Sequence, residues 1–259
     1  MSLSETTKNV LRLVEERSGI PVHVEPDANL PGTLLARGIM ARGTLALHRV
    51  FYRPDSSSPP DYLICQQAGF ILRFFDVPPE RRFDLAPSDE GTAEVERLVK
   101  AHPVAGALPA AALPQLSEML RDGLLNHLRS VPVAMRVDRW LGVNYPDLLG
   151  LQKESVLCQV QDSVATLAPE HRSITPQMIF DATQTISAAF TLFWSGRLEQ
   201  PQLPLPFKAA GYVQAGQILL DLWESTPDMA ENDRAIIDGW AERLGIAGCY
   251  QWVPYATPK

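Results

Sequence analysis

A run of fifteen residues, DYLICQQAGFILRFF at positions 61–75, constrains the fold more than any other part of the chain. Drawn as an α-helix, it carries apolar side chains on nearly every side, which is typical of a helix enclosed by its neighbours. The Ser/Pro-rich segment 55–60 before it predicts a loop whose final prolines suit a helix start. Asp61 places negative charge at the positive end of the helix dipole, and Pro78 and Pro79 forbid continuation. We therefore predict a buried helix over 61–75.

The residues Gln66, Gln67, Gly69 and Phe70 give this helix a further meaning. The run resembles the active-site helix of zincin metallopeptidases of the ImmA/IrrE type, in which H-E-x-G-H is followed by small and aliphatic residues. With Gly69 aligned on the family's glycine, Gln66 and Gln67 stand where the family has His and Glu. Phe70 then stands where the family has its second His. The resemblance implies a degenerate member that keeps the helix and lacks the metal-binding residues.

The chemistry of these three side chains excludes the family's reaction at this helix. Positions 66 and 70 lie one helical turn apart, so two imidazoles there would hold one zinc ion. Phe70 offers no lone pair, and the amide of Gln66 is a poor zinc ligand. Gln67 cannot act as a general base, because an amide has no useful pKa near neutrality. We predict neither zinc nor another cofactor here. An unrelated core helix is the competing interpretation, since short apolar runs match many patterns by chance.

A second stretch extends the resemblance. Residues 132–140, PVAMRVDRW, followed by Gln152, resemble the helical extension of uncharacterised zincin-like proteins. In that setting Asp138 is the possible third metal position. The competing interpretation is a cluster of Arg136, Asp138 and Arg139 on a helix surface, because neighbouring charges on helices usually face water or pair locally.

The first sixty residues predict one helix and a small sheet. Residues 4–18 form an amphipathic pattern, 20–24 is extended, and 34–40 and 44–52 are strand-like runs around a turn at 41–43. The resemblance implies that an edge strand of this sheet borders the cleft beside the central helix and can pair with an extended peptide. The run 44–52 is the candidate for that strand. Because strand addition depends on backbone hydrogen bonds, peptide binding can survive the loss of zinc.

From Thr92 onward the patterns are helical, and we predict an α+β fold. A small antiparallel sheet packs on the buried central helix, and a mostly helical C-terminal half follows. We divide the chain into a zincin-like part, 1–85, and a helical part, 90–259, packed together as one compact unit. We expect a helix over 115–129 to end at Ser130-Val131-Pro132. The aromatic tail 250–255 is expected to fold back onto the body, with exposure as a contact site the alternative.

Composition narrows the class of partner and the compartment. The net charge of -7 and the pI near 5.3 argue against a nucleic-acid partner held by electrostatics. The sequence contains no run of eighteen apolar residues and has a polar N-terminus, so we expect no membrane partner and a cytoplasmic location. Three well-separated cysteines, Cys65, Cys158 and Cys249, are expected to be buried and reduced.

These observations favour a catalytically inactive, zincin-like protein that binds a protein or peptide. The alternative is a hydrolase whose non-standard active site uses other residues of the same cleft, with His48, Cys65, Asp138 and Tyr62 as candidates. A third hypothesis is a helical adaptor that contacts its partner through the aromatic tail. Sequence alone leaves the partner, the substrate and the oligomeric state open.

Overall fold

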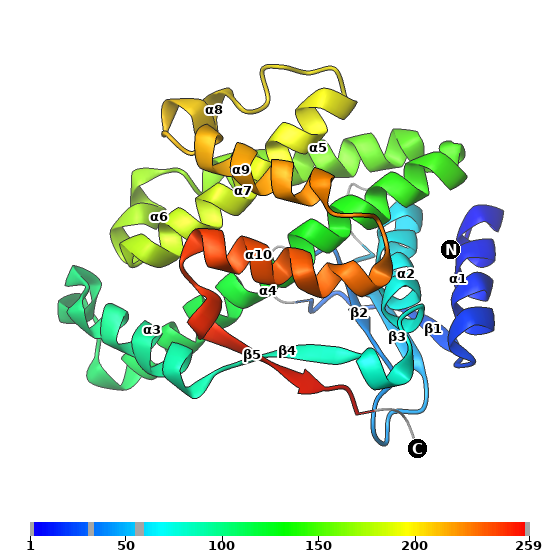
Figure 1. Cartoon of the computed structure of the whole chain (residues 1–259), viewed down its shortest axis with the longest axis horizontal. Coiled ribbons are helices and arrows are strands. Elements are labelled where there is room, and N and C mark those ends of the chain that lie inside the picture. The colour runs from blue at the N-terminus through cyan, green and yellow to red at the C-terminus, as the bar shows by residue number, and fades with distance from the viewer. Residues whose placement is uncertain (1–2, 31–33, 55–59, 257–259) are drawn as a thin grey trace. The chain divides into compact units, whose positions relative to one another are not determined.

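The computed structural model describes residues 3–30, 34–54 and 60–256. Apart from Pro60, the loop predicted over 55–60 lies outside the described residues. The chain divides into two compact units, unit 1 (Met1–Asp84, Val133–Leu157 and Pro254–Lys259) and unit 2 (Leu85–Pro132 and Cys158–Val253). Figure 1 labels their helices and strands.

Unit 1 begins with helix α1 (Glu5–Ser18), which closely matches the predicted range. The hydroxyl of Ser4 caps its first turn by accepting a hydrogen bond from the Thr7 N–H at 3.1 Å. Gly19 ends the helix in the left-handed region at φ 71°, and its N–H donates to the Glu15 carbonyl at 2.9 Å. The apolar side of α1 packs on the central helix α2.

A three-stranded sheet follows, formed by β1 (Val22–Pro26), β2 (Ala36–Ile39) and β3 (His48–Tyr52) in the order β1-β3-β2. β2 and β3 pair antiparallel, as the turn at 41–43 predicts, and Gly43 there has φ 55°. β1 pairs parallel with β3, so the sheet is mixed and not antiparallel throughout.

The prediction that the run 44–52 forms an edge strand is wrong. The run 44–52 contains β3, which lies between the other two strands, so β2 is an edge strand in the part of the chain that is described. Hydrophobic alternation identifies both strands of the hairpin but not which of them also pairs with β1.

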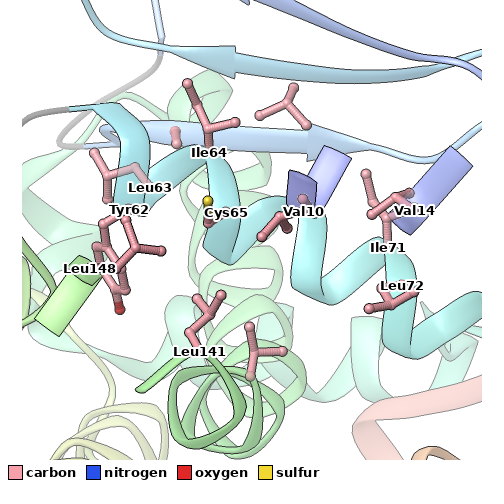
Figure 2. Close-up of a cluster of buried hydrophobic side chains, with 14 of the residues drawn as sticks. Val10, Val14, Tyr62, Leu63, Ile64, Cys65, Ile71, Leu72, Leu141 and Leu148 are labelled. Carbon is pink, nitrogen blue, oxygen red and sulfur yellow. The ribbon is translucent and has the colours of Figure 1, made fainter. Parts of the chain in front are cut away.

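Helix α2 (Pro60–Phe75) is the buried helix predicted from its composition. Eleven of its 16 residues are buried, which confirms that neighbours enclose it on most sides. Figure 2 shows Val10 and Val14 of α1 together with Leu141 and Leu148 of later segments gathered around it.

Those later segments belong to α4 and its successors. α4 (Leu113–Asn144) is one continuous helix that contains Pro132, so the predicted helix end at Ser130-Val131-Pro132 is wrong. From Val133 onward it is part of unit 1, together with η4 (Pro146–Leu148) and the first half of α5 (Leu149–Ala165). The predicted division into 1–85 and 90–259 did not anticipate that helices from the second half complete the N-terminal core.

The aromatic tail also joins unit 1 at its end. After the turn η1 (Pro79–Arg81), strand β4 (Phe83–Pro87) pairs with β5 (Tyr250–Pro254). Tyr255 is 7% exposed, its hydroxyl donates to the Ala41 carbonyl, and its N–H donates to the Arg82 carbonyl at 3.0 Å. The expectation that the tail folds back is confirmed.

Unit 2 is almost entirely helical. Its helices are α3 (Asp89–Ala101), the first part of α4, the second half of α5, α6 (Pro169–Ile174), α7 (Gln177–Arg197), α8 (Leu205–Ala209), α9 (Val213–Ser225) and α10 (Asp233–Leu244), with short 3₁₀ turns at η2 (Pro103–Ala107), η3 (Ala110–Ala112), η5 (Ala230–Asn232) and η6 (Ala247–Cys249). α7 and α9 pack closely because Gly216 has no side chain. A Cβ there would lie 2.8 Å from the Cβ of Ala188.

The fold is therefore α+β with a helical C-terminal half, as predicted. Of the cysteines expected to be buried, Cys65 and Cys249 are buried and all three are free thiols. Cys158 is exposed on α5, so its predicted burial is wrong.

Candidate functional site

Helix α2 and the second part of α4 bring three of the predicted residues together. Tyr62 and Gln66 lie one turn apart on α2 and therefore share a face. The hydroxyl of Tyr62 donates to Asp138 Oδ1 at 2.7 Å, and Gln66 Nε2 lies 2.9 Å from the same oxygen. Gln66 Nε2 is also 3.1 Å from the Tyr62 hydroxyl oxygen. The structure thus places Asp138 beside Gln66, although 72 positions separate them.

This cluster is closed to solvent. Tyr62 is fully buried, Asp138 is 1% exposed and Gln66 is 7% exposed. Gln152 on α5 donates from Nε2 to the Asp138 carbonyl at 2.9 Å, which fixes the backbone that carries the carboxylate. Burial, reinforced by the adjacent carboxylate of Asp138, raises the pKa of Tyr62 well above its usual value of 10. The Tyr62 hydroxyl therefore acts as a hydrogen-bond donor and not as a base.

The location of Asp138 overturns the surface-cluster interpretation. Arg136 and Asp138 are each 1% exposed, so neither lies on a solvated helix face. α4 can approach α2 here because Gly69 has no side chain. A Cβ on Gly69 would lie 2.4 Å from Cγ1 of Val137, the residue next to Asp138.

Gln67 points to the sheet. Its Oε1 accepts a hydrogen bond from the backbone N–H of Gly38 on β2, at 2.8 Å. Gly38 itself permits this approach, because a Cβ there would lie 3.2 Å from Gln67 Oε1 and 3.6 Å from Gln67 Cβ. A glycine inside a strand pattern often marks a close approach of another segment, and this was the one sequence signal for the contact.

The hydrogen-bond pattern shows which groups of β2 face outward. The Arg53 N–H donates to the Leu35 carbonyl at 2.8 Å, so in the antiparallel register residues 35, 37 and 39 point their backbone groups to β3. Ala36 and Gly38 then direct theirs to the open edge of the strand. Gln67 Oε1 consequently stands where the carbonyl oxygen of a further strand would stand.

The other edge, on β1, carries a comparable contact. There the Val22 N–H donates to Glu15 Oε1 at 2.9 Å. Pro21 and Asp27 both bond to β3, so residues 22, 24 and 26 face outward. Among these three residues, Pro26 has no N–H and the Val22 N–H is bound by Glu15. Val24 therefore carries the remaining outward N–H of β1.

The residues at the motif positions do not fit a zinc ion. The amide of Gln66 is held by Asp138 and Tyr62, and Phe70 supplies a hydrocarbon ring that packs against the hydrophobic cluster around α2. Asp138 is the single carboxylate, imidazole or thiolate among these positions, whereas zinc sites use three or four such ligands. Throughout the described ranges, no three His, Cys, Asp or Glu residues lie close enough to hold a metal.

The other candidates, His48 and Cys65, have separate partners. Nδ1 of His48 accepts from the Ala41 N–H at 3.0 Å, and its ring meets the edge of Phe75 at 4.8 Å. Burial lowers the pKa of His48 to about 4. Cys65 lies 3.6 Å from the Thr7 hydroxyl, and burial raises the pKa of its thiol to about 12. The described contacts of His48 and of Cys65 therefore involve different partners and supply no nucleophile–base pair.

Comparisons with protein-family models, with curated proteins and with solved structures gave no match to this chain. In the part of the chain that the structure describes, no helix combines the length and the apolar character needed to cross a membrane.

Proposed function

We propose that this chain is a peptide-binding protein without hydrolytic activity, related to degenerate zincins, which holds an extended peptide along the open edge of β2. The observation that carries the proposal is the 2.8 Å hydrogen bond from the Gly38 N–H to Gln67 Oε1. A side-chain amide carbonyl accepts from the outward N–H that a partner strand would use, which supports strand addition at this edge.

The chemistry of the edges favours β2 over β1. β1 presents Pro26 at one outward position, and the Val22 N–H is bound by the charged Glu15. Proline and charged side chains are the usual means by which proteins protect an edge strand from pairing. The outward N–H of Gly38 is held instead by the neutral amide of Gln67, which a peptide carbonyl can replace with an equivalent hydrogen bond.

The side chains around α2 support binding without hydrolysis. The side-chain amide of Gln67 does not titrate near neutrality and cannot act as a general base, and the Tyr62–Asp138 pair is buried within the core. A hydrolase with a non-standard site was the alternative, and the raised pKa of Tyr62 is the observation in its favour. Complete burial of Tyr62 counts against it, because a substrate would have to enter the core to meet that hydroxyl.

The test begins with selection of a random dodecapeptide library, displayed on phage, against the whole chain. A selected peptide is then labelled with fluorescein, and its affinity is measured by fluorescence anisotropy. Hydrogen exchange followed by NMR on the bound protein reports which strand is covered. We expect slowed exchange at the Ala36 amide, because an added strand would bond to it, while the outward Val24 amide of β1 is unchanged.

Three results would overturn the proposal. The first is failure of the selection to yield a peptide that binds, and the second is binding that protects β1 or neither edge. The third is cleavage of the bound peptide during prolonged incubation, measured by mass spectrometry. Cleavage that EDTA abolishes would assign metal-dependent hydrolysis to the chain.

A further inference from the structure

The contact between Gln67 and Gly38 closes part of the edge on which the proposed function depends. Gln67 is partly buried on α2, and its amide oxygen takes the single N–H that Gly38 directs outward. A peptide paired in register along β2 would need that same N–H. The two acceptors, Gln67 Oε1 and a peptide carbonyl, cannot hold the linear hydrogen bond together.

We infer that Gln67 is an internal competitor of the peptide, and that it sets the affinity of the β2 edge. The inference rests on the proposed function. In the free protein the Gln67 amide satisfies the Gly38 N–H and shields the edge. On binding, a carbonyl of the peptide replaces Gln67 Oε1, and the amide swings away from the strand.

The chain supplies its own matched control at the opposite edge of the sheet. Glu15 Oε1 accepts from the Val22 N–H at 2.9 Å, close to the 2.8 Å between Gln67 and Gly38. Both contacts pair a side-chain oxygen with an outward N–H of an edge strand. They differ in the strand and in the charge of the acceptor. Removing each side chain in turn therefore distinguishes an effect specific to the β2 edge from the effect of freeing an N–H on either edge of the sheet.

The experiment compares Gln67→Met, Gln67→Glu and Glu15→Ala with the unaltered chain, using the fluorescein-labelled peptide from the library selection. Methionine keeps approximately the length of glutamine but has no carbonyl acceptor. We expect Gln67→Met to bind the peptide about three- to tenfold more tightly, which corresponds to the net worth of one hydrogen bond. Gln67→Glu keeps an acceptor and is expected to show no gain, and Glu15→Ala is expected to bind as the unaltered chain does.

Hydrogen exchange gives a readout that needs no peptide. The Gly38 amide is expected to exchange faster in Gln67→Met than in the unaltered chain, and the Val22 amide faster in Glu15→Ala. Faster exchange at Gly38 with unchanged or weaker peptide affinity would overturn the competitor role while leaving peptide binding intact. Equal gains in Gln67→Met and Glu15→Ala would also overturn it. Absence of peptide binding in every protein, the unaltered chain included, would instead refute the proposed function.

Discussion

The Tyr62 hydroxyl and Asp138 Oδ1 lie 2.7 Å apart, joined by a hydrogen bond between residues 76 positions apart in the chain. This bond fastens α2 to α4 inside the hydrophobic cluster, at the place where the zincin resemblance would put a metal. Gln66 donates to the same oxygen, so two neutral donors contribute to stabilising this buried carboxylate.

Replacing Tyr62 with phenylalanine should destabilise the protein by about 1–3 kcal/mol, since Asp138 would lose one of its buried donors. Urea denaturation measures the change. Tyr145→Phe is a suitable control, because Tyr145 is only partly buried in the same unit. A Tyr62→Phe variant as stable as the control would show that the bond contributes nothing.

The same tyrosine should make the protein sensitive to alkaline solution. The folded state raises the pKa of Tyr62 above its usual value of 10. As pH rises above 10, the unfolded chain therefore loses this proton while the folded chain keeps it, and stability falls. We expect a smaller fall between pH 10 and 11 in Tyr62→Phe than in the unaltered protein, measured as the free energy of unfolding at each pH. Identical slopes would contradict this.

The hydrogen bond between Gln66 and Asp138 could be predicted only in part from the sequence. Periodicity indicates that α2 is buried, because apolar residues surround it, but spacing alone cannot bring together residues 72 positions apart. The resemblance supplied Asp138 as a possible third metal position near the helix. The competing surface cluster followed from a general rule for charged residues, and it was wrong because Asp138 is buried and accepts hydrogen bonds from Tyr62 and Gln66.

Restoring imidazoles at the motif positions tests the resemblance. In Gln66→His/Phe70→His two imidazoles would share one helix face, with the Asp138 carboxylate beside the first. We expect the double variant to bind one Co²⁺ ion with the visible absorption of a tetrahedral site, and the unaltered chain to bind none. Titration by absorption spectroscopy measures the stoichiometry.

The controls for cobalt binding are Gln66→His alone and the triple variant that adds Asp138→Asn. Both should bind cobalt at least tenfold more weakly, because each lacks one of the three ligands. If the folded double variant bound no cobalt, positions 66, 70 and 138 would not converge as in a zincin, and the resemblance would be refuted.

Acid should destabilise the protein through His48. Burial lowers its folded pKa from 6.5 to about 4, so below pH 6.5 the unfolded chain binds a proton that the folded chain does not. Stability should therefore fall by up to about 3 kcal/mol between pH 6.5 and 4. In His48→Asn the amide oxygen can still accept from the Ala41 N–H without titrating, and this part of the slope should vanish. His127, whose pKa is also lowered to about 4, is common to both proteins and cancels in the comparison.

Tyr255, near the C-terminus, should stabilise the core of unit 1. Tyr255 packs its ring against Phe74 at 4.7 Å and lies under the guanidinium of Arg42 at 5.0 Å. Tyr255→Ala should cost about 3–5 kcal/mol in thermal or urea unfolding, as for other buried aromatic residues. The exposed Gln251→Ala should change stability by about 0.5 kcal/mol or less. Equal effects of the two substitutions would contradict the role of Tyr255 in the core.

Two features of unit 1 could not be read from local patterns. The run that contains β3 has the same alternation whether it lies at the edge or the centre, because the parallel partner β1 is remote from the hairpin. The bond from Gly38 to Gln67 depends on how closely a helix crosses a strand, and the sequence shows only a glycine at that point.

The close approach of α2 and α4 leads to the last prediction, at Gly69. A Cβ there would lie 2.4 Å from Val137 Cγ1, so Gly69→Ala should destabilise the protein by about 1–3 kcal/mol despite the higher helix propensity of alanine. Gly123→Ala is the matched control. It also lies within a helix, has no neighbour within 4 Å of the added Cβ, and should stabilise the protein by up to about 1 kcal/mol.

A double-mutant cycle identifies the cause of the loss at Gly69. Val137→Ala removes the methyl group that the new Cβ would meet, so Gly69→Ala should cost less in the Val137→Ala background than in the unaltered protein. The expected coupling between the two substitutions is about 1 kcal/mol or more, measured by urea denaturation of all four proteins. Strictly additive effects would mean that α4 does not contact α2 at Gly69. They would also contradict the position of Asp138 beside Gln66.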